Sequence, residues 1–416
     1  MKTAILLSAI ATVTAGEIPA TTTTEEVSTS SSSATGLLLG KLTGETAMDR
    51  AWSAFTLYKN EDNPILQEFS LQGRLQLQFA DGHETGDGHF DSSQRNDEGN
   101  WGDDIDIRRA RLGFKSKWFK MFKLDGQIDI DPNLQPDIYH GIYDLYLTYA
   151  PSDAFNLSAG KTKVKFSREQ EISSKEILTI ERSLLSNMLF PGELTGIWMN
   201  GKGIQGGWLY ELGVYGNERN REFTDGDGGT IVLAKIGYDY SSAVGLESAV
   251  ASIHYMHNSE PNFTGNHRST ASSSLLKSPN FSDSFAITNE ITQGRFGLTS
   301  EVLFASGEGS QSDVMGFSII PSYFIAEGLQ VVGRFQYATS DDVNDLTLPS
   351  RYEGFAPSMG DKKGDAYMST YLGLNYYIYG HKLKLMSGIE YSTLDGNTGG
   401  GDYDGYTFMT GLRFSF

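Results

Sequence analysis

The chain has no cysteine, no long apolar segment and few histidines, and each absence excludes a class of structure or site. Without cysteine its stability cannot come from disulfides, although an oxidising compartment would permit them. No segment has the ~20 consecutive apolar residues that a transmembrane helix needs. Basic residues are in the minority, because 33 Lys and Arg stand against 52 Asp and Glu. The resulting net charge of −19 argues against nucleic-acid binding, which needs a basic surface.

The N-terminus has the pattern of a secretory signal peptide. Lys2 supplies the positive start, residues 4–13 form a short apolar run, and residues 13–15 offer the small side chains that a signal peptidase prefers. The apolar run is too short to cross a bilayer of about 30 Å as a helix. We therefore expect an exported protein, with residues 1–15 as its signal peptide.

The next segment, residues 16–64, is predicted to be a leader that precedes the main domain. It contains the low-complexity run TTTTEEVSTSSSSA, which cannot bury apolar surface. Leu38, Leu42 and Trp52 then have loose helical spacing, which predicts a short helix within residues 36–60.

From about residue 65 to Phe416 the sequence alternates between apolar and polar residues. In EFSLQGRLQLQF, residues 68–79, Phe, Leu and Gly alternate with Glu, Ser, Gln and Arg. Successive side chains of a strand point to opposite faces, so this strand has one apolar face and one wet face. The last strand is the clearest case, with one apolar and one polar set: Tyr406, Phe408, Leu412, Phe414 and Phe416 against Thr407, Arg413 and Ser415.

These strands favour a transmembrane antiparallel β-barrel over a soluble β-sandwich. Sandwich strands usually have ~5–6 residues, whereas the alternating segments here have about ten or more. Short turns alternate with long polar connections, which is the plan of a membrane barrel. Candidate strands over residues 65–416 number roughly sixteen, and bacterial barrels have even numbers. The long connections are expected at 81–104, 166–193, 219–229, 258–281, 341–364 and 393–403.

Three stretches resemble the polyphosphate/phosphate-selective porin family. The first is IDIRRARLGFKSKWF at 105–119, an Arg-Arg-x-Arg strand after a long acidic loop. The second is IYDLYLTYAPSDAFNLSAGKTKVKFSREQ at 142–170, a strand, tight turn and strand that ends in a Gly-Lys-x-Lys run. The third is LTIERSLLSNMLFPGELTGIWMNGK at 178–202. The resemblance extends over roughly residues 65–416.

This resemblance implies a trimeric outer-membrane porin of about sixteen strands. The long loop after the fifth strand, here residues 166–193, would fold into the lumen and narrow it. Arginines and lysines on the inner wall would then guide anions. The partners to expect are outer-membrane lipid, small inorganic anions or other solutes, two further copies of the chain, and the barrel-assembly machinery, which would recognise the C-terminal strand. No cofactor is expected.

The Arg-Arg-x-Arg strand supplies the first candidate pore-lining residues. Because the residues between them are apolar, Arg109, Arg111 and Lys115 are expected to face the lumen as a ladder. Arginine suits anion guidance because it stays charged and presents a planar fork of N–H donors. Arg108 falls on the wrong parity, which a β-bulge near residues 107–109 would reconcile. The alternative is a charged patch that only pairs with acidic residues on neighbouring strands.

The start of the constricting loop supplies the second candidate group. Lys161 and Lys163 share the parity of lipid-facing residues, where a charge costs ~2–4 kcal/mol at the membrane midplane and little near the rim. Either the strand slips register near Gly160, or these lysines lie at the loop rim. In both cases they would stand with Arg168 and Arg182 at the entrance to the constriction. The alternative is a solvated rim that binds nothing.

Charges of both signs are expected on the inner wall and in the loop. The lumen parity carries bases such as Arg334, Lys384 and Arg413, and acids such as Asp125, Asp129 and Glu390. The loop itself contains Glu181 next to Arg182, which would form a structural pair. This mixture weakens the case for a strongly phosphate-selective lumen, because acidic groups repel anions.

Neither catalysis nor a metal site is expected. Catalysis needs a nucleophile, a base and an orienting group brought together, and no local motif proposes them. The acidic Gly-rich stretches at 225–229 and 395–404 resemble calcium loops, but neither has a full set of oxygen ligands. The sequence therefore predicts a passive diffusion porin of the bacterial outer membrane with an anion preference, phosphate-like in character. The alternatives are a structural or adhesive barrel with acidic surface loops, and a general or cation porin.

Overall fold

The computed structural model describes most of the chain after residue 43. The described ranges are 44–84, 100–130, 138–218, 222–261, 280–342, 345–349, 352–353, 363–396 and 403–416. The predicted signal peptide and the low-complexity run lie outside these residues, as does part of the acidic stretch 395–404. Within the described ranges, no helix is long and apolar enough to cross a membrane.

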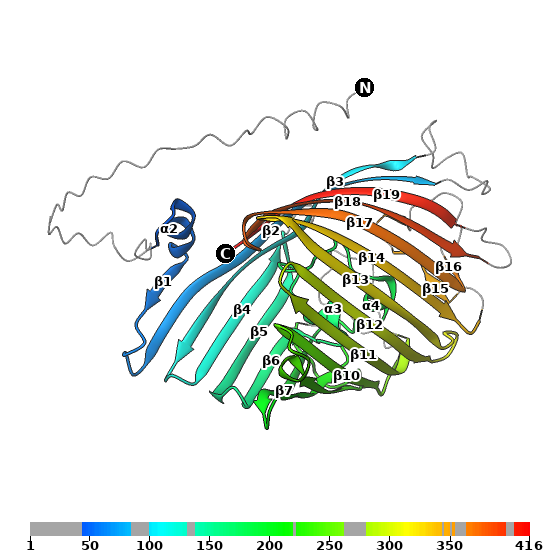
Figure 1. The fold of residues 1–416 in the computed structure, drawn as a ribbon. Coiled ribbons are helices and arrows are strands. Elements are labelled where there is room, and N and C mark those ends of the chain that lie inside the picture. The colour runs from blue at the N-terminus through cyan, green and yellow to red at the C-terminus, as the bar shows by residue number, and fades with distance from the viewer. Residues whose placement is uncertain are drawn as a thin grey trace, which may run out of the picture. The chain divides into compact units, whose positions relative to one another are not determined.

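Sixteen antiparallel strands form a closed barrel (Figure 1). Each strand pairs with its neighbours in sequence, and the last, β19, pairs with the first, β2, so the sheet has no open edge. The all-β barrel predicted from the sequence is confirmed. Its strands are β2 (Leu66–Glu84), β3 (Asn100–Trp118), β4 (Phe122–Ile130), β5 (Tyr139–Ser152), β6 (Phe155–Lys163), β7 (Glu193–Ile204), β8 (Trp208–Gly216), β9 (Thr230–Asp239), β10 (Ser248–Asn258), β11 (Phe281–Gln293), β12 (Phe296–Gly307), β13 (Val314–Ala326), β14 (Leu329–Ser340), β17 (Ala366–Tyr379), β18 (Leu383–Asp395) and β19 (Tyr403–Ser415).

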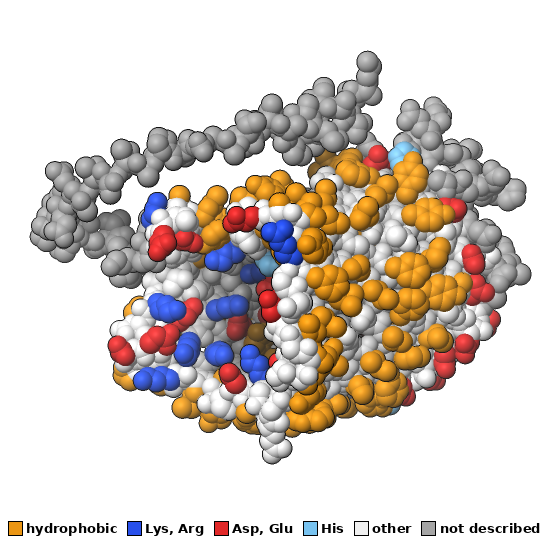
Figure 2. Space-filling model, in the orientation of Figure 1, with side chains coloured by type: hydrophobic (Ala, Val, Ile, Leu, Met, Phe, Trp, Pro, Cys, Tyr) orange, Lys and Arg blue, Asp and Glu red, His pale blue; other side chains and the backbone are white. Residues whose placement is uncertain are grey.

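The outer face of the barrel is apolar and the inner face is largely polar. In β19, Phe408 points outward and is 37% exposed, whereas Arg413 points inward and is 1% exposed. Figure 2 shows apolar side chains spread over the outer wall and a hollow in which Lys and Arg gather among Asp and Glu. An apolar exterior around a polar interior is the distribution that a lipid-embedded barrel requires.

A β-bulge in β3 turns the whole Arg-Arg-x-Arg motif toward the interior. Gln76 of β2 lies opposite Arg109, and the next residue of β2 lies opposite Ile107, so Arg108 is the extra residue. The bulge predicted near residues 107–109 is therefore present. It lets Ile105 and Leu112 both face outward, with exposures of 81% and 51%, although their sequence parity differs.

The two ends of the barrel differ in the length of their connections. One end, called the short-turn end below, carries the turns 119–121, 153–154, 205–207, 294–295, 327–328 and 380–382, and also the short helix α5 (Ser241–Val244) between β9 and β10. Acidic side chains gather at the opposite, long-loop end (Figure 2). In transmembrane barrels, short turns face the periplasm and long loops face outward.

A short N-terminal segment packs across the seam where β19 meets β2. It comprises α2 (Ala47–Ser53), which Thr46 caps by accepting from the Asp49 amide at 3.0 Å, and β1 (Thr56–Lys59), which pairs with the start of β2. We call residues 46–59 the N-terminal clasp. A helix within residues 36–60 was predicted, and α2 is that helix.

Aromatic side chains join the N-terminal clasp to the end of the chain. The Trp52 indole donates to the carbonyl of Ser415 at 2.7 Å. The ring of Phe55 stacks on that of Phe416, with centroids 3.9 Å apart. Because β1 pairs with β2 only beyond the point where β19 ends, the clasp covers a strand edge that would otherwise be unpaired.

We expect Phe55→Ala to destabilise the barrel by about 2 kcal/mol, roughly half the loss for a fully buried Phe, because the ring is half-buried. Urea unfolding of the protein in lipid vesicles, followed by tryptophan fluorescence, measures this. Met48→Ala on the exposed side of α2 is the matched control, since Met48 is 38% exposed. Equal unfolding free energies for the two variants would contradict a role for the clasp.

Candidate functional site

Residues 164–192, between β6 and β7, fold into the barrel and cross its interior. We call this segment the constriction loop; it contains α3 (Arg168–Glu171) and α4 (Leu184–Met188). It follows the fifth barrel strand, as the family resemblance implied. One side of the loop is held by an apolar cluster with the inner wall, which includes Val164, Phe166, Leu184, Leu185 and Leu189 of the loop and Leu303, Val314 and Ala338 of the wall.

Side chains of β14, β18 and β19 hold the tip of the constriction loop by its backbone carbonyls. Three wall cations, each at most 3% exposed, donate to successive parts of the tip. The donors and acceptors are Lys384 to Ile177 at 2.7 Å, Arg413 to Ile180 at 3.1 Å and Arg334 to Glu181 at 2.6 Å. These lumen-facing cations therefore satisfy buried carbonyl groups, and their role is to hold the loop.

Glu181 and Arg182 do not form the structural pair that was expected. Glu181 accepts two hydrogen bonds from Arg108, at 2.6 and 3.0 Å. Burial alone would raise the pKa of Glu181, but the guanidinium of Arg108 holds it well below the usual range. Arg182 donates instead to the carbonyls of Glu169 and Ile172, at 2.7 and 2.8 Å, and so braces α3.

The predicted ladder of Arg109, Arg111 and Lys115 lies on one inward face, but its members differ in their partners. Arg111 makes two hydrogen bonds to Asp129, at 3.1 and 3.2 Å, and lies over the ring of Tyr143. Lys115 is 3.9 Å from Asp125 and its side chain is 58% exposed. The alternative interpretation, pairing with acidic neighbours, therefore describes Arg111 and partly describes Lys115.

Arg109 and Lys163 are the two candidate cations without such a partner. Arg109 donates to the amide oxygen of Gln76 at 3.0 Å, and the Lys163 ammonium lies 5.7 Å from the centroid of the Phe190 ring. Among the described residues, neither has a carboxylate within salt-bridge distance. The charges that act on Lys163 are those of Arg182, of Glu193, which lies directly opposite it on β7, and of Arg109, so these groups are neighbours. We call Arg109 and Lys163 the unpaired cation pair.

Lys161 and Arg168 are both engaged by carboxylates. Lys161 is buried and lies 3.5 Å from Glu222 of the loop after β8. The pairing of β6 continues without a shift through Gly160, so the register slip is not observed and Lys161 lies at the loop rim. Arg168 pairs with Glu171 at 3.2 Å and also with Glu290 of β11.

Tyr143 belongs to the site and was not identified from the sequence. It is the extra residue of a bulge in β5, because Asp144 pairs with Gln127 whereas Ile142 pairs with the next residue of β4. A signal was present: Ile142 and Leu145 are three residues apart, which breaks a two-residue alternation. The bulge brings the Tyr143 ring under the guanidinium of Arg111.

A second segment also enters the barrel, within the long connection that was expected at 341–364. Leu346 and Leu348 are at most 2% exposed and belong to the same apolar cluster as the constriction loop. The Tyr352 hydroxyl accepts a hydrogen bond from Gln78 of β2 at 2.6 Å. A small sheet of β15 (Leu346–Thr347) and β16 (Lys363–Gly364) is part of this segment. The long connection is present as predicted, but part of it lies inside the barrel, because burial of its apolar residues is favourable.

The acidic stretch 225–229 is held by hydrogen bonds to Glu218. Glu218 accepts from the Gly228 amide at 3.1 Å and from the Thr224 hydroxyl. Across the described ranges, no group of three or more His, Asp or Glu side chains is arranged to hold a metal ion.

Lys175 in the constriction loop predicts a dependence of ion selectivity on pH. Burial, together with the charges of Arg74 and Lys115, lowers its pKa to about 8. The ammonium is therefore charged below pH 8 and is lost as the pH rises through that value. We expect anion selectivity, measured as reversal potential in a salt gradient, to fall between pH 7 and pH 9.

Burial and the neighbouring Glu390 raise the pKa of Glu353 to about 8, so this carboxyl gains negative charge over the same interval. Lys175→Arg separates the two groups, since arginine stays charged at pH 9. A pH dependence that is unchanged in Lys175→Arg would contradict the role of Lys175.

Comparison with known proteins finds one matching family and several solved structures with a similar fold. The family described as phosphate-selective porin O and P matches residues 81–269, a little under half of the chain. This range contains all three stretches in which the resemblance was recognised, so the resemblance is confirmed there. Comparison with curated proteins finds no match.

Solved structures of outer-membrane proteins share the barrel. OmpT of Vibrio cholerae has a TM-score of 0.53 at 11% identity, over 86% of this chain and 100% of its own. OmpF of Salmonella typhi has a TM-score of 0.54 at 12% identity, over 87% and 100%. An anion-selective porin from Comamonas acidovorans has a TM-score of 0.52 at 11% identity, over 84% and 99%. At such identities the similarity establishes the fold alone.

Proposed function

We propose that the protein is an outer-membrane porin through which small anions, phosphate-like ones included, diffuse past the unpaired cation pair. The observation that carries the proposal is that Arg109 and Lys163 stand beside the constriction loop with no carboxylate partner among the described residues. The other cations that were candidates for this role are engaged by carboxylates or backbone carbonyls. A guanidinium and a lysine amine that are not held in a salt bridge have N–H donors available to replace part of the hydration shell of a passing oxyanion.

Several features of the molecule support this function over catalysis. The matched family and the barrel fold favour a channel. The apolar outer wall suits the outer membrane, with the short-turn end facing the periplasm. Assembly into a homotrimer, and insertion through recognition of β19, are further parts of the proposal that follow the family resemblance.

The test is the reversal potential of the purified protein in a planar bilayer, under salt gradients of potassium chloride and potassium phosphate. We expect anion selectivity in both salts. Cation selectivity in both would contradict the proposal and favour a general or cation porin.

A structural barrel is the second candidate, and the second inward segment favours it. Leu346, Leu348 and Tyr352 occupy space in the lumen that a wide channel would leave open. Failure of correctly folded protein to raise bilayer conductance would support this candidate.

A further inference from the structure

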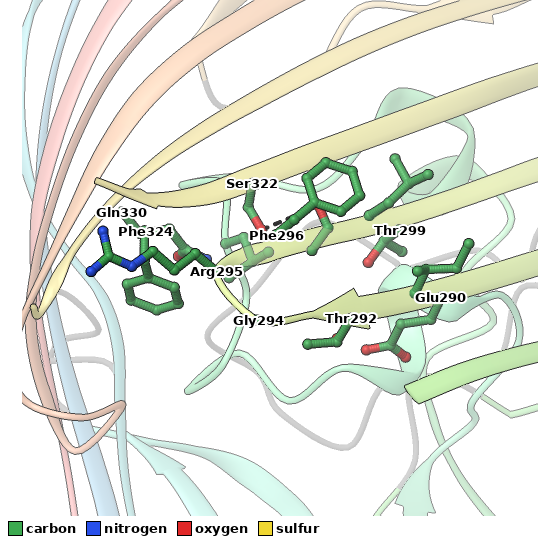
Figure 3. Close-up of a pocket in the computed structure, with 13 residues that line it drawn as sticks. Glu290, Thr292, Gly294, Arg295, Phe296, Thr299, Ser322, Phe324 and Gln330 are labelled. Carbon is green, nitrogen blue, oxygen red and sulfur yellow. Dashed lines mark hydrogen bonds between the residues drawn. The ribbon is translucent and has the colours of Figure 1, made fainter. Parts of the chain in front are cut away.

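A recess lies on the inner wall of β11–β14, on the side of the lumen away from β3 and β4. Its volume is about 190 Å³, and Leu178 from the tip of the constriction loop contributes to its lining. Figure 3 shows that its side chains come from neighbouring strands, with Glu290 at one end and Arg295, in the turn between β11 and β12, at the other. Thr299 of β12 and Ser322 of β13 lie between them.

The polar groups of the recess are of several kinds. Ser322 and Thr299 offer hydroxyls, Gln330 of β14 offers an amide, and the carboxylate of Glu290 lies at the far end. Gln330 is oriented by the Tyr377 hydroxyl, which donates to its side-chain oxygen at 2.6 Å, and this leaves the amide nitrogen to face the recess. Within the described residues, neither the Thr299 hydroxyl nor that nitrogen has a protein hydrogen-bond partner.

Arg295 supplies a cation that is not neutralised. It is exposed in its turn, and among the described residues its guanidinium has neither an ion pair nor a hydrogen-bond partner. Glu290, in contrast, is already paired with Arg168 of the constriction loop. The end of the recess at Arg295 is therefore positive, and the remainder combines these polar groups with apolar side chains and has no free charge.

We propose that this recess binds the hydroxylated body of a short organic anion, such as a polyol phosphate ester, with the anionic group held by Arg295. The hydroxyls of such a molecule match the donors and acceptors of Thr299, Ser322 and Gln330, and the face of Phe324 packs against its carbon skeleton. A volume of about 190 Å³ admits a skeleton of a few carbon atoms. Inorganic phosphate lacks the hydroxylated body and gains only the contact with Arg295.

The inference rests on the proposed function in one respect, because the ligand must enter the lumen to reach the recess. Binding in the recess is nevertheless separate from the diffusion of anions past the unpaired cation pair. A molecule that uses the recess would be retained near the short-turn end, which would extend the solutes of the channel from inorganic anions to hydroxylated organic ones.

The test is saturation-transfer NMR on the detergent-solubilised full chain, with glycerol 3-phosphate, inorganic phosphate and glycerol as separate probes. We expect glycerol 3-phosphate to bind at least about tenfold more tightly than inorganic phosphate, which lacks the hydroxyls, and than glycerol, which lacks the anionic group that Arg295 holds. Arg295→Gln should weaken this binding at least about fivefold by removing the charge-assisted contact. Thr299→Val, which removes a hydroxyl at constant shape, should weaken it about fivefold as well.

Lys382→Gln is the matched control, since it removes an exposed cation from another turn at the same end and should leave binding unchanged. Equal affinity for glycerol 3-phosphate and inorganic phosphate would overturn the proposal, as would unchanged affinity in both Arg295→Gln and Thr299→Val. The NMR measurement detects binding whether or not the protein conducts ions. Selective binding by a protein that fails to conduct anions would therefore refute the proposed function and leave the recess intact.

Discussion

Replacing Arg109 and Lys163 together by glutamine should abolish the anion preference of the channel. A unit charge about 4 Å from a passing ion contributes about 1 kcal/mol even in bulk water and about 4 kcal/mol near a protein surface. Loss of the Arg109 charge together with the Lys163 donor should lower the anion-to-cation permeability ratio by at least about tenfold. The measurement is the reversal potential under a potassium chloride gradient, with block by phosphate recorded on the same channels.

Lys202→Gln combined with Lys382→Gln is the matched control for this variant. It removes the same number of charges, but from exposed positions in or beside the turns. We expect the control to retain the reversal potential of the unaltered protein. If both double variants shift the potential equally, the selectivity comes from the overall charge of the protein, and the unpaired cation pair is not the site.

Replacing Arg334 by methionine should destabilise the barrel and release the constriction loop. Arg334 is 3% exposed. Its guanidinium donates hydrogen bonds to the Glu390 carboxylate at 2.7 Å and to the backbone carbonyl of Glu181 at 2.6 Å. Its removal leaves a buried carboxylate without its counter-ion, which costs about 3–5 kcal/mol. Urea unfolding in lipid vesicles measures the stability. Single-channel recording should show a larger, noisier conductance, because the loop tip has lost one of its anchors.

The double variant Arg334→Met with Glu390→Gln tests whether the unpaired charge causes that loss. Glutamine keeps a hydrogen-bonding side chain beside the hydroxyl of Ser369, which donates to Glu390 at 2.6 Å, and it carries no charge. We expect the double variant to recover most of the stability while the conductance stays enlarged. Recovery of both properties, or of neither, would contradict the separation of charge pairing from loop anchoring.

The barrel could be predicted from the sequence because its signal is local. Alternation of apolar and polar residues assigns each side chain of a strand to one face, as with Phe408 and Arg413. The same rule located the bulge at Arg108, since a break in alternation has few physical explanations. Applied with equal care to Ile142 and Leu145, it would have located the bulge at Tyr143 as well.

Which cations are free to meet an anion was decided only by the tertiary structure. Arg109 and Arg111 are indistinguishable by residue type and parity, yet Arg111 lies opposite Asp129 and Arg109 does not. Lys163 lies opposite Glu193 of β7 but, among the described residues, forms no salt bridge, whereas Lys161, two positions earlier in the strand, is 3.5 Å from Glu222.

The barrel architecture, its apolar exterior, its closing strand and its inward loop could be predicted from the sequence alone, through local periodicity and the stretches that resemble a porin family. The partners of Arg334, Lys384 and Arg413 were decided by the path of the constriction loop across the lumen. Periodicity specifies the face that a side chain occupies, and long-range packing specifies what it meets there. The function of a charged residue inside a barrel depends on this long-range packing.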